Sequence, residues 1–177
     1  MANRTIYRFL HYGLGLALLA AAIHLGWEYS HGGVRSHHLL ARRELPAVSN
    51  WWGLVVLPVL GWIASRTAVH RAAHDERAAS RSVAAFLGSL SVGATLSASF
   101  TMGYESFASG LFLTSLAAGL VLPTYRAEYM FGFVLGMTFV LGSVLPTIVA
   151  LLAAAISAAA YFWVRPALTS LLRNARA

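Results

Sequence analysis

The chain has 177 residues, of which 58% are hydrophobic and only 11% are charged. A soluble domain usually carries about 25% charged residues, so there are too few charges here to cover a surface that faces water. We therefore expect an all-α integral membrane protein that forms a single transmembrane domain over residues 1–177. The formal net charge of +7 would suggest nucleic acid as the partner of a soluble protein. In a membrane protein, arginine-rich cytoplasmic loops that contact anionic lipid headgroups explain this charge, and no nucleic acid is expected.

Two residue types are absent, and their absence excludes several chemistries. The chain has no cysteine, which excludes disulfides, thiolate metal sites and cysteine nucleophiles. All 13 basic residues are arginines, and without lysine no Schiff base with retinal or pyridoxal phosphate can form.

Six apolar stretches predict a bundle of about six transmembrane helices. The first stretch resembles a secretory signal as well, but it is long enough to span a membrane and we expect it to be retained. Ser49 or Asn50 is a good N-cap for the second helix, Pro123 should end the fourth, and Gly142 and Pro146 should divide the last apolar segment into two. The predicted spans cover residues 6–27, 50–69, 82–102, 107–122, 128–142 and 146–164.

The arginine distribution predicts that both termini lie in the cytoplasm. With six spans, the N-terminus, the loop 66–81, the turn at Arg126 and the C-terminal tail share one side and hold ten arginines, whereas the opposite loop, residues 28–49, holds three. The positive-inside rule makes the richer side cytoplasmic, as in a multi-pass protein of a bacterial-type inner membrane.

The cytoplasmic loop has a second polar feature. Its basic residues and two histidines would line one side of a helix against anionic headgroups, and a metal pair formed by His70 and His74 is the alternative.

Small residues predict how the helices pack. Ser89, Gly93, Ser97 and Thr101 recur every four residues in the third span, and Gly132 and Gly136 form a GxxxG pattern in the fifth. Small residues at this spacing let helices approach closely in lipid. The hydroxyl ladder of the third span is also compatible with a polar lining for a solute path.

The densest group of metal-ligand residue types lies at the periplasmic end of the first span. His24, Glu28 and His31 share one face of a helix that continues toward Gly32, because they are four and seven residues apart. Two imidazoles and a carboxylate are ligands of a divalent ion such as zinc, and His37 or His38 would complete the site. Glu28 would then act as a ligand or as the catalytic general base.

A structural alternative remains open for this group. The histidines would bond to backbone carbonyls or lie among the headgroups, and Glu28 would pair with Arg35, Arg42 or Arg43. After the glycine turn, Ser36 is expected to cap a short surface helix that ends before Pro46.

Three functions are compatible with these features. The first is a transporter or channel for a small solute or metal ion, and the second is a metal-dependent membrane enzyme that acts on a lipid or headgroup-level substrate at the periplasmic face. The third is a non-catalytic subunit of a larger membrane complex; a homo-oligomer is also compatible. Spans two to six show no clearly embedded charge, with Glu105 and Glu128 at span ends, which counts against coupled transport of charged solutes.

Overall fold

The computed structural model describes residues 2–38, 44, 46–75 and 77–166. Over these residues the all-α prediction is confirmed, since the described chain forms six α-helices and one short two-stranded ladder. The helices are α1 (Ala2–Ser30), α2 (Gly53–Ala72), α3 (Ala78–Thr101), α4 (Glu105–Val121), α5 (Ala127–Leu141) and α6 (Val144–Ala159). The minor elements are strands β1 (Ser36–His38) and β2 (Ala47–Ser49), the 3-10 turn η2 (Asn50–Trp52) and the π-helical turn η3 (Ala160–Val164), which continues α6.

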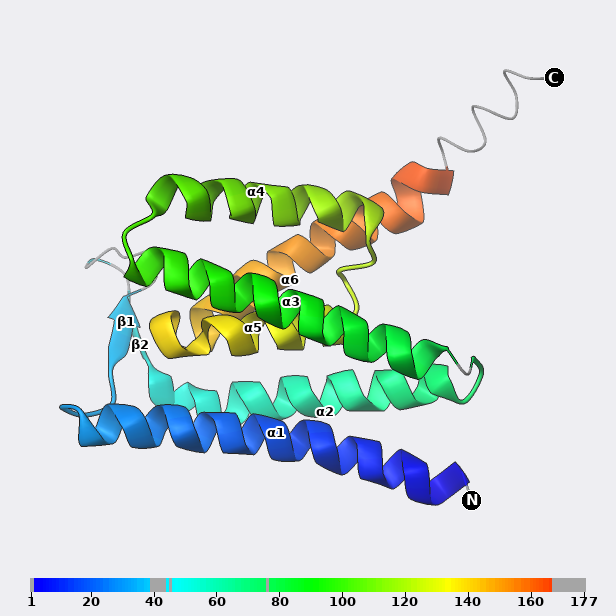
Figure 1. Ribbon diagram of the computed structural model, residues 1–177, viewed down its shortest axis with the longest axis horizontal. Coiled ribbons are helices and arrows are strands. Elements are labelled where there is room, and N and C mark those ends of the chain that lie inside the picture. The colour runs from blue at the N-terminus through cyan, green and yellow to red at the C-terminus, as the bar shows by residue number, and fades with distance from the viewer. Residues whose placement is uncertain (1, 39–43, 45, 76, 167–177) are drawn as a thin grey trace.

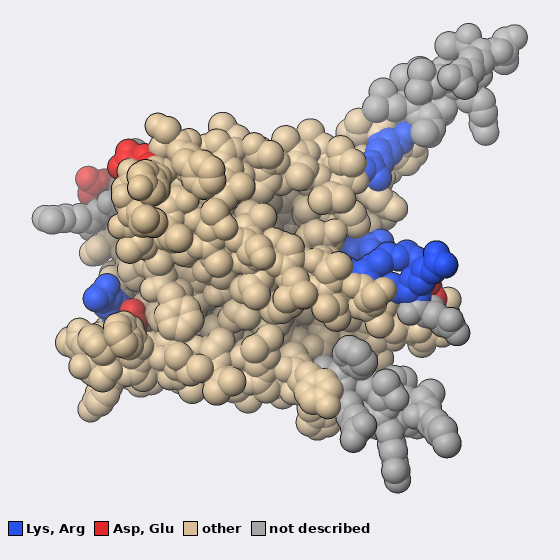
Figure 2. Space-filling view, in the orientation of Figure 1, with Lys and Arg blue, Asp and Glu red and all other residues tan. Residues whose placement is uncertain are grey.

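Successive helices run in opposite directions between the two ends of the bundle (Figure 1). We call one the hairpin end; it holds β1, β2, η2 and the connections 102–104 and 142–143. The other is the arginine end, which holds the start of α1, the connections 73–77 and 122–126, and the end of η3. Figure 2 shows the basic side chains gathered at the arginine end; those described there are Arg66, Arg71, Arg77, Arg81, Arg126 and Arg165.

Proline and glycine end the helices where the sequence predicts. α4 stops at Val121, and Leu122 is extended immediately before Pro123. α5 stops at Leu141 because Gly142 takes a positive φ of 68°, a conformation that disfavours other residues. Pro146 lies in the first turn of α6, where its missing N–H has no helical partner to lose.

Two expectations about the connections are wrong. Ser36 begins β1 and pairs with Ser49 of β2 in an antiparallel ladder, so this part of the connection is extended and not helical. The ladder makes the backbone hydrogen bonds that a surface helix would have made internally. The loop 66–81 is not one helix either, because α2 ends at Ala72 and α3 begins at Ala78. Its basic residues therefore belong to two helices and the turn between them.

α3 and α5 pack closely against each other through glycines, as the small-residue pattern predicts. A Cβ atom on Gly136 would lie 2.6 Å from the carbonyl oxygen of Leu90, and one on Gly93 would lie 3.2 Å from the Cα of Gly136. Ser97 Oγ crosses this interface and donates to the carbonyl oxygen of Gly136 at 2.9 Å. The spacing in α3 thus serves helix packing.

Four further hydroxyls toward the end of α3 donate to their own helix. Ser91, Thr95, Ser99 and Thr101 each bond to the carbonyl oxygen four residues earlier, at 2.7–2.9 Å. Such bonds satisfy a hydroxyl in an apolar environment without a polar partner elsewhere. These side chains do not require a water-filled path.

Large apolar side chains cover much of the lateral surface. Leu113, Val121, Leu152 and Trp163 are each more than 60% exposed. Within the described residues, three helical segments are long and apolar enough to cross a membrane, namely Asn50–Ala72, Ala78–Thr101 and Val144–Val164, while α4 and α5 are shorter apolar helices.

Candidate functional site: a buried polar cluster at the hairpin end

The last turns of α1 carry a histidine and a glutamate into the interior of the bundle. His24 and Glu28 are four residues apart, so they share one face of α1, and they are only 2% and 6% exposed. His24 Nε2 lies 3.5 Å from Glu28 Oε1. This nitrogen is fully buried and makes no hydrogen bond within the described chain. Burying a polar nitrogen without a partner is unfavourable, so it marks a site that can accept a proton or a ligand.

The carboxylate of Glu28 is held by two donors from the segment that joins α1 to α2. Asn50 Nδ2 donates to Oε1 at 2.7 Å, and the backbone N–H of Arg35 donates to Oε2 at 3.2 Å. Both donors are placed by the β1–β2 ladder, because the N–H of Asn50 also donates to the carbonyl oxygen of Arg35 at 3.0 Å. The strands that replace the expected surface helix therefore position the partners of Glu28.

Charge compensation at Glu28 is incomplete within the described residues. Of the arginines expected to pair with it, Arg35 contributes its backbone N–H, and Arg42 and Arg43 lie outside the described residues. Among the described side chains, the salt-bridge partner of Glu28 is His24, which carries charge only when protonated. A proton or a cation at His24 Nε2 would therefore neutralise the buried carboxylate.

The connection between α5 and α6 closes the cluster from the other side. The Asn50 side chain packs directly on Gly142, so that a Cβ atom at position 142 would collide with it. Ser143 is 1% exposed, and its hydroxyl makes no hydrogen bond within the described chain. The ring of Phe139 meets the edge of the His24 ring at a centroid distance of 5.3 Å. The cluster of His24, Glu28, Asn50 and Ser143 is thus enclosed by α1, η2 and the α5–α6 connection.

The other predicted metal ligands lie in the turn after α1 and in the strand ladder. His31 stacks on Trp27 with ring centroids 3.7 Å apart, and its Nδ1 lies 2.9 Å from the carbonyl oxygen of Trp27. His37 pairs with Val48 in the ladder, and His38 pairs with Ala47. Within the described residues, no group of three or more His, Asp or Glu side chains is close enough to hold a metal ion. Of the predicted set, His24 and Glu28 are in direct contact.

Sequence reasoning missed Asn50 and Ser143 as members of the site. Ser49 or Asn50 was expected to cap the second helix, and Ser49 caps the 3-10 turn η2 before α2 by accepting from the N–H of Trp51 at 3.4 Å. The sequence did offer one signal for them. Asn50 and Ser143 lie at the ends of predicted spans, on the same predicted side of the membrane as Glu28.

A second buried carboxylate lies at the arginine end, where sequence alone indicated only a span end. Glu128 is 3% exposed and forms an ion pair with Arg71 at 2.6 Å. Ser82 Oγ donates to its other oxygen at 3.3 Å. This carboxylate is neutralised by a guanidinium, so its chemistry differs from that of Glu28.

His70 and His74 lie close together at the arginine end. Their ring centroids are 5.1 Å apart, but His74 Nδ1 lies 2.9 Å from the carbonyl oxygen of His70. One nitrogen of the pair is therefore engaged by the backbone.

No protein-family model, curated protein or solved structure matches this chain.

Proposed function

We propose that the chain is a multi-pass protein of a bacterial-type inner membrane with its arginine end in the cytoplasm. The exposed apolar side chains and the long apolar helices support this, because lipid is the solvent that such a surface suits. Exposed tryptophans near the ends of the bundle, Trp27, Trp51 and Trp52 at one and Trp163 toward the other, fit the two interfaces. The gathering of arginines at one end supports the orientation.

Within that membrane we propose that the protein carries a small cation, captured from the periplasmic side at His24 and Glu28. The observation that supports this most directly is His24 Nε2, which is buried, makes no hydrogen bond within the described chain and lies 3.5 Å from Glu28 Oε1. An imidazole nitrogen and a carboxylate oxygen are ligands for divalent zinc and similar ions. Two protein ligands are too few for a permanent structural zinc site, which favours an ion that is bound transiently as cargo.

The core of the bundle favours a carrier over an open channel. A cluster of apolar side chains lies between the polar groups of the two ends; it includes Ala17, Ala21, Leu57, Leu60, Ala64, Phe131 and Val134. Ions do not cross such a layer without its rearrangement. In the proposed cycle, the bundle must therefore change shape to release cargo at the arginine end.

A general-base role for Glu28 in a membrane enzyme has less support. Both carboxylate oxygens already accept hydrogen bonds, from Asn50 Nδ2 and from the N–H of Arg35. These donors hold the carboxylate in place and occupy both of its oxygens. We therefore assign Glu28 the role of a fixed negative charge beside His24.

The test is Zn²⁺ uptake into proteoliposomes that contain a zinc-sensitive dye. We expect uptake by the unmodified protein, and we expect His24→Ala and Glu28→Gln to reduce it to the level of protein-free vesicles, because each removes one of two ligands. His31→Ala is the matched control, since this exposed histidine bonds to its own helix and should leave uptake unchanged. Uptake that equals that of protein-free vesicles, or that persists in His24→Ala, would refute the proposal.

A further inference from the structure

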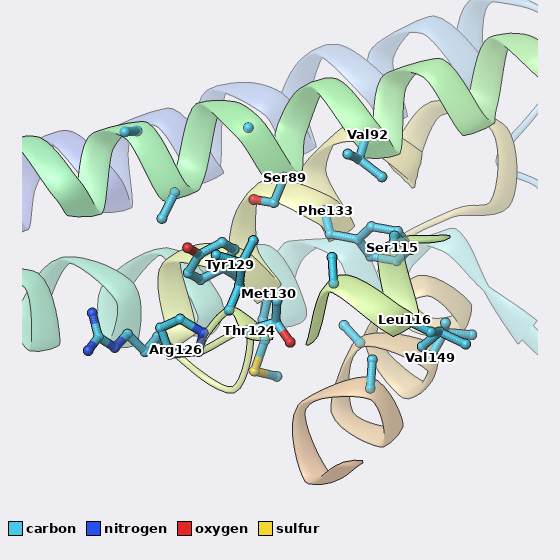
Figure 3. A pocket seen from close by; sticks show the side chains of 18 of the residues that line it. Ser89, Val92, Ser115, Leu116, Thr124, Arg126, Tyr129, Met130, Phe133 and Val149 are labelled. Carbon is cyan, nitrogen blue, oxygen red and sulfur yellow. The ribbon is translucent and has the colours of Figure 1, made fainter. Parts of the chain in front are cut away.

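A large apolar cleft lies between α3, α4, α5 and α6, away from the His24 cluster. Its volume is about 630 Å³, within the range of about 300–1,000 Å³ that is typical of ligand pockets. The cleft exists because α4 packs against α3 and α6 while small residues such as Gly88, Ala118 and Ala153 face the space between the helices. Figure 3 shows Val92 and Phe133 along one wall and Leu116 and Val149 along the other.

The wall of this cleft offers almost no hydrogen-bonding groups to an occupant. Ser89 Oγ donates to the carbonyl oxygen of Phe86 at 3.0 Å, and Ser115 Oγ donates to that of Phe112 at 2.7 Å. Both hydroxyls are therefore satisfied within their own helices. The interior suits a hydrocarbon chain and does not suit a polar solute.

The mouth of the cleft, in contrast, is cationic and carries hydroxyl groups. Arg81, Arg126, Thr124 and Tyr129 line the cleft at the arginine end, and Figure 3 shows Arg126 beside Tyr129 and Thr124. Arg126 makes no salt bridge with any described carboxylate. Arg81 pairs with Asp75 at 2.9 Å, but this pair is largely exposed and is easily exchanged for another anion.

We propose that this cleft binds an anionic phospholipid from the cytoplasmic leaflet, with one acyl chain between α4 and α5 and the phosphate at Arg81 and Arg126. The apolar wall matches the chain, and the two arginines at the mouth match the charge of the headgroup phosphate. The proposal rests on the membrane placement given above but is independent of the His24 cluster at the opposite end.

Gly88 provides a way to fill the cleft without disturbing the fold. A Cβ atom on this glycine would meet nothing within 4 Å, so the side chain of Gly88→Leu can extend into the cleft. Gly110 of α4 is a matched control, because it also has open space around its Cα and does not line the cleft. Both substitutions replace a mid-helix glycine by a better helix former.

The experiment reconstitutes the full chain with equal amounts of phosphatidylglycerol and phosphatidylcholine, extracts it into detergent and counts retained lipids by native mass spectrometry. We expect phosphatidylglycerol to be retained by the unmodified protein and by Gly110→Leu, and to be lost from Gly88→Leu. Arg126→Gln should lower retention by about fivefold, the contribution of one arginine near an anionic headgroup. His24→Ala should leave retention unchanged, which separates this test from that of cation transport.

Two outcomes would overturn the assignment: retention of phosphatidylcholine equal to that of phosphatidylglycerol, or full retention of phosphatidylglycerol in a folded Gly88→Leu variant. If Gly88→Leu does not fold, the surface variants Arg81→Gln and Arg126→Gln test the proposal instead. A preference for phosphatidylglycerol over phosphatidylcholine that persists in both variants would contradict the proposed headgroup contacts.

Discussion

Glu28 and Glu128 are both buried, yet their negative charges are stabilised in different ways. Glu128 accepts hydrogen bonds from the guanidinium of Arg71 and from the hydroxyl of Ser82. Glu28 accepts them from the neutral amide of Asn50 and from a backbone N–H. An ion pair cancels charge, whereas neutral donors only solvate it. Glu128 is therefore suited to holding the fold together, and Glu28 is suited to attracting a cation or a proton.

This difference leads to a stability prediction for Glu128→Gln. The substitution leaves the guanidinium of Arg71 without its anion in a partly buried position, and we expect unfolding to become easier by about 1–3 kcal/mol. Thermal denaturation in detergent, followed by circular dichroism, measures this loss.

Asp75→Asn supplies the control, because it breaks the exposed pair with Arg81 and should change stability by only about 0–1 kcal/mol. Equal losses in Glu128→Gln and Asp75→Asn would contradict the structural role assigned to Glu128.

At the scale of helices, backbone contact between α3 and α5 depends on glycine. The Cβ atom of Gly136→Ala would lie 2.6 Å from both the amide nitrogen of Ala94 and the carbonyl oxygen of Leu90. These are backbone atoms and cannot rotate away, so the helices must separate, at a cost of about 1–3 kcal/mol. Thermal melts should show this loss for Gly136→Ala but none for Gly110→Ala, which has open space. A stable Gly136→Ala variant would mean that the interface is looser than described.

The helix ends could be predicted from sequence because they depend on local residue chemistry. Pro123, Gly142 and Pro146 act on the backbone beside them, and the i, i+4 spacing alone places His24 next to Glu28. Asn50 could not be predicted as a partner of Glu28, since the two are 22 residues apart and meet only through the strand ladder. The prediction for Ser36 was wrong for a related reason, because a serine can cap a helix or begin a strand, and the pairing of Ser36 with Ser49 depends on a segment 13 residues away.

At the scale of the whole molecule, α2 connects the two polar ends. Asn50 precedes it at the hairpin end, and Arg71 lies in its last turn at the arginine end. Between these ends, Gly61 packs on α1, where a Cβ atom would lie 2.6 Å from the carbonyl oxygen of Gly13. Side-chain and backbone contacts along its length therefore set the position of α2. The turn after α2 contributes little to that position.

This arrangement predicts that the chain can be divided in that turn. Co-expressed fragments 1–75 and 76–177, with an affinity tag on one of them, should co-purify from membranes, because helices that insert separately associate through packing. Two described salt bridges join the fragments, namely the exposed pair of Asp75 and Arg81 and the more buried pair of Arg71 and Glu128. Failure to co-purify would show that the turn itself holds α2 against α3, whereas weaker recovery with Glu128→Gln would support the role of the buried ion pair.

The two carboxylates also differ in when they can find their partners during synthesis. Glu28 and Asn50 are 22 residues apart, so their contact can form once the start of α2 has left the ribosome. Arg71 and Glu128 are separated by 57 residues, so in the proposed membrane placement Arg71 waits at the membrane surface until α5 is made. An arginine held there by headgroups opposes translocation of the α2–α3 turn. Under that proposal, the residue that later completes the ion pair first helps to fix the direction in which the first helical hairpin inserts.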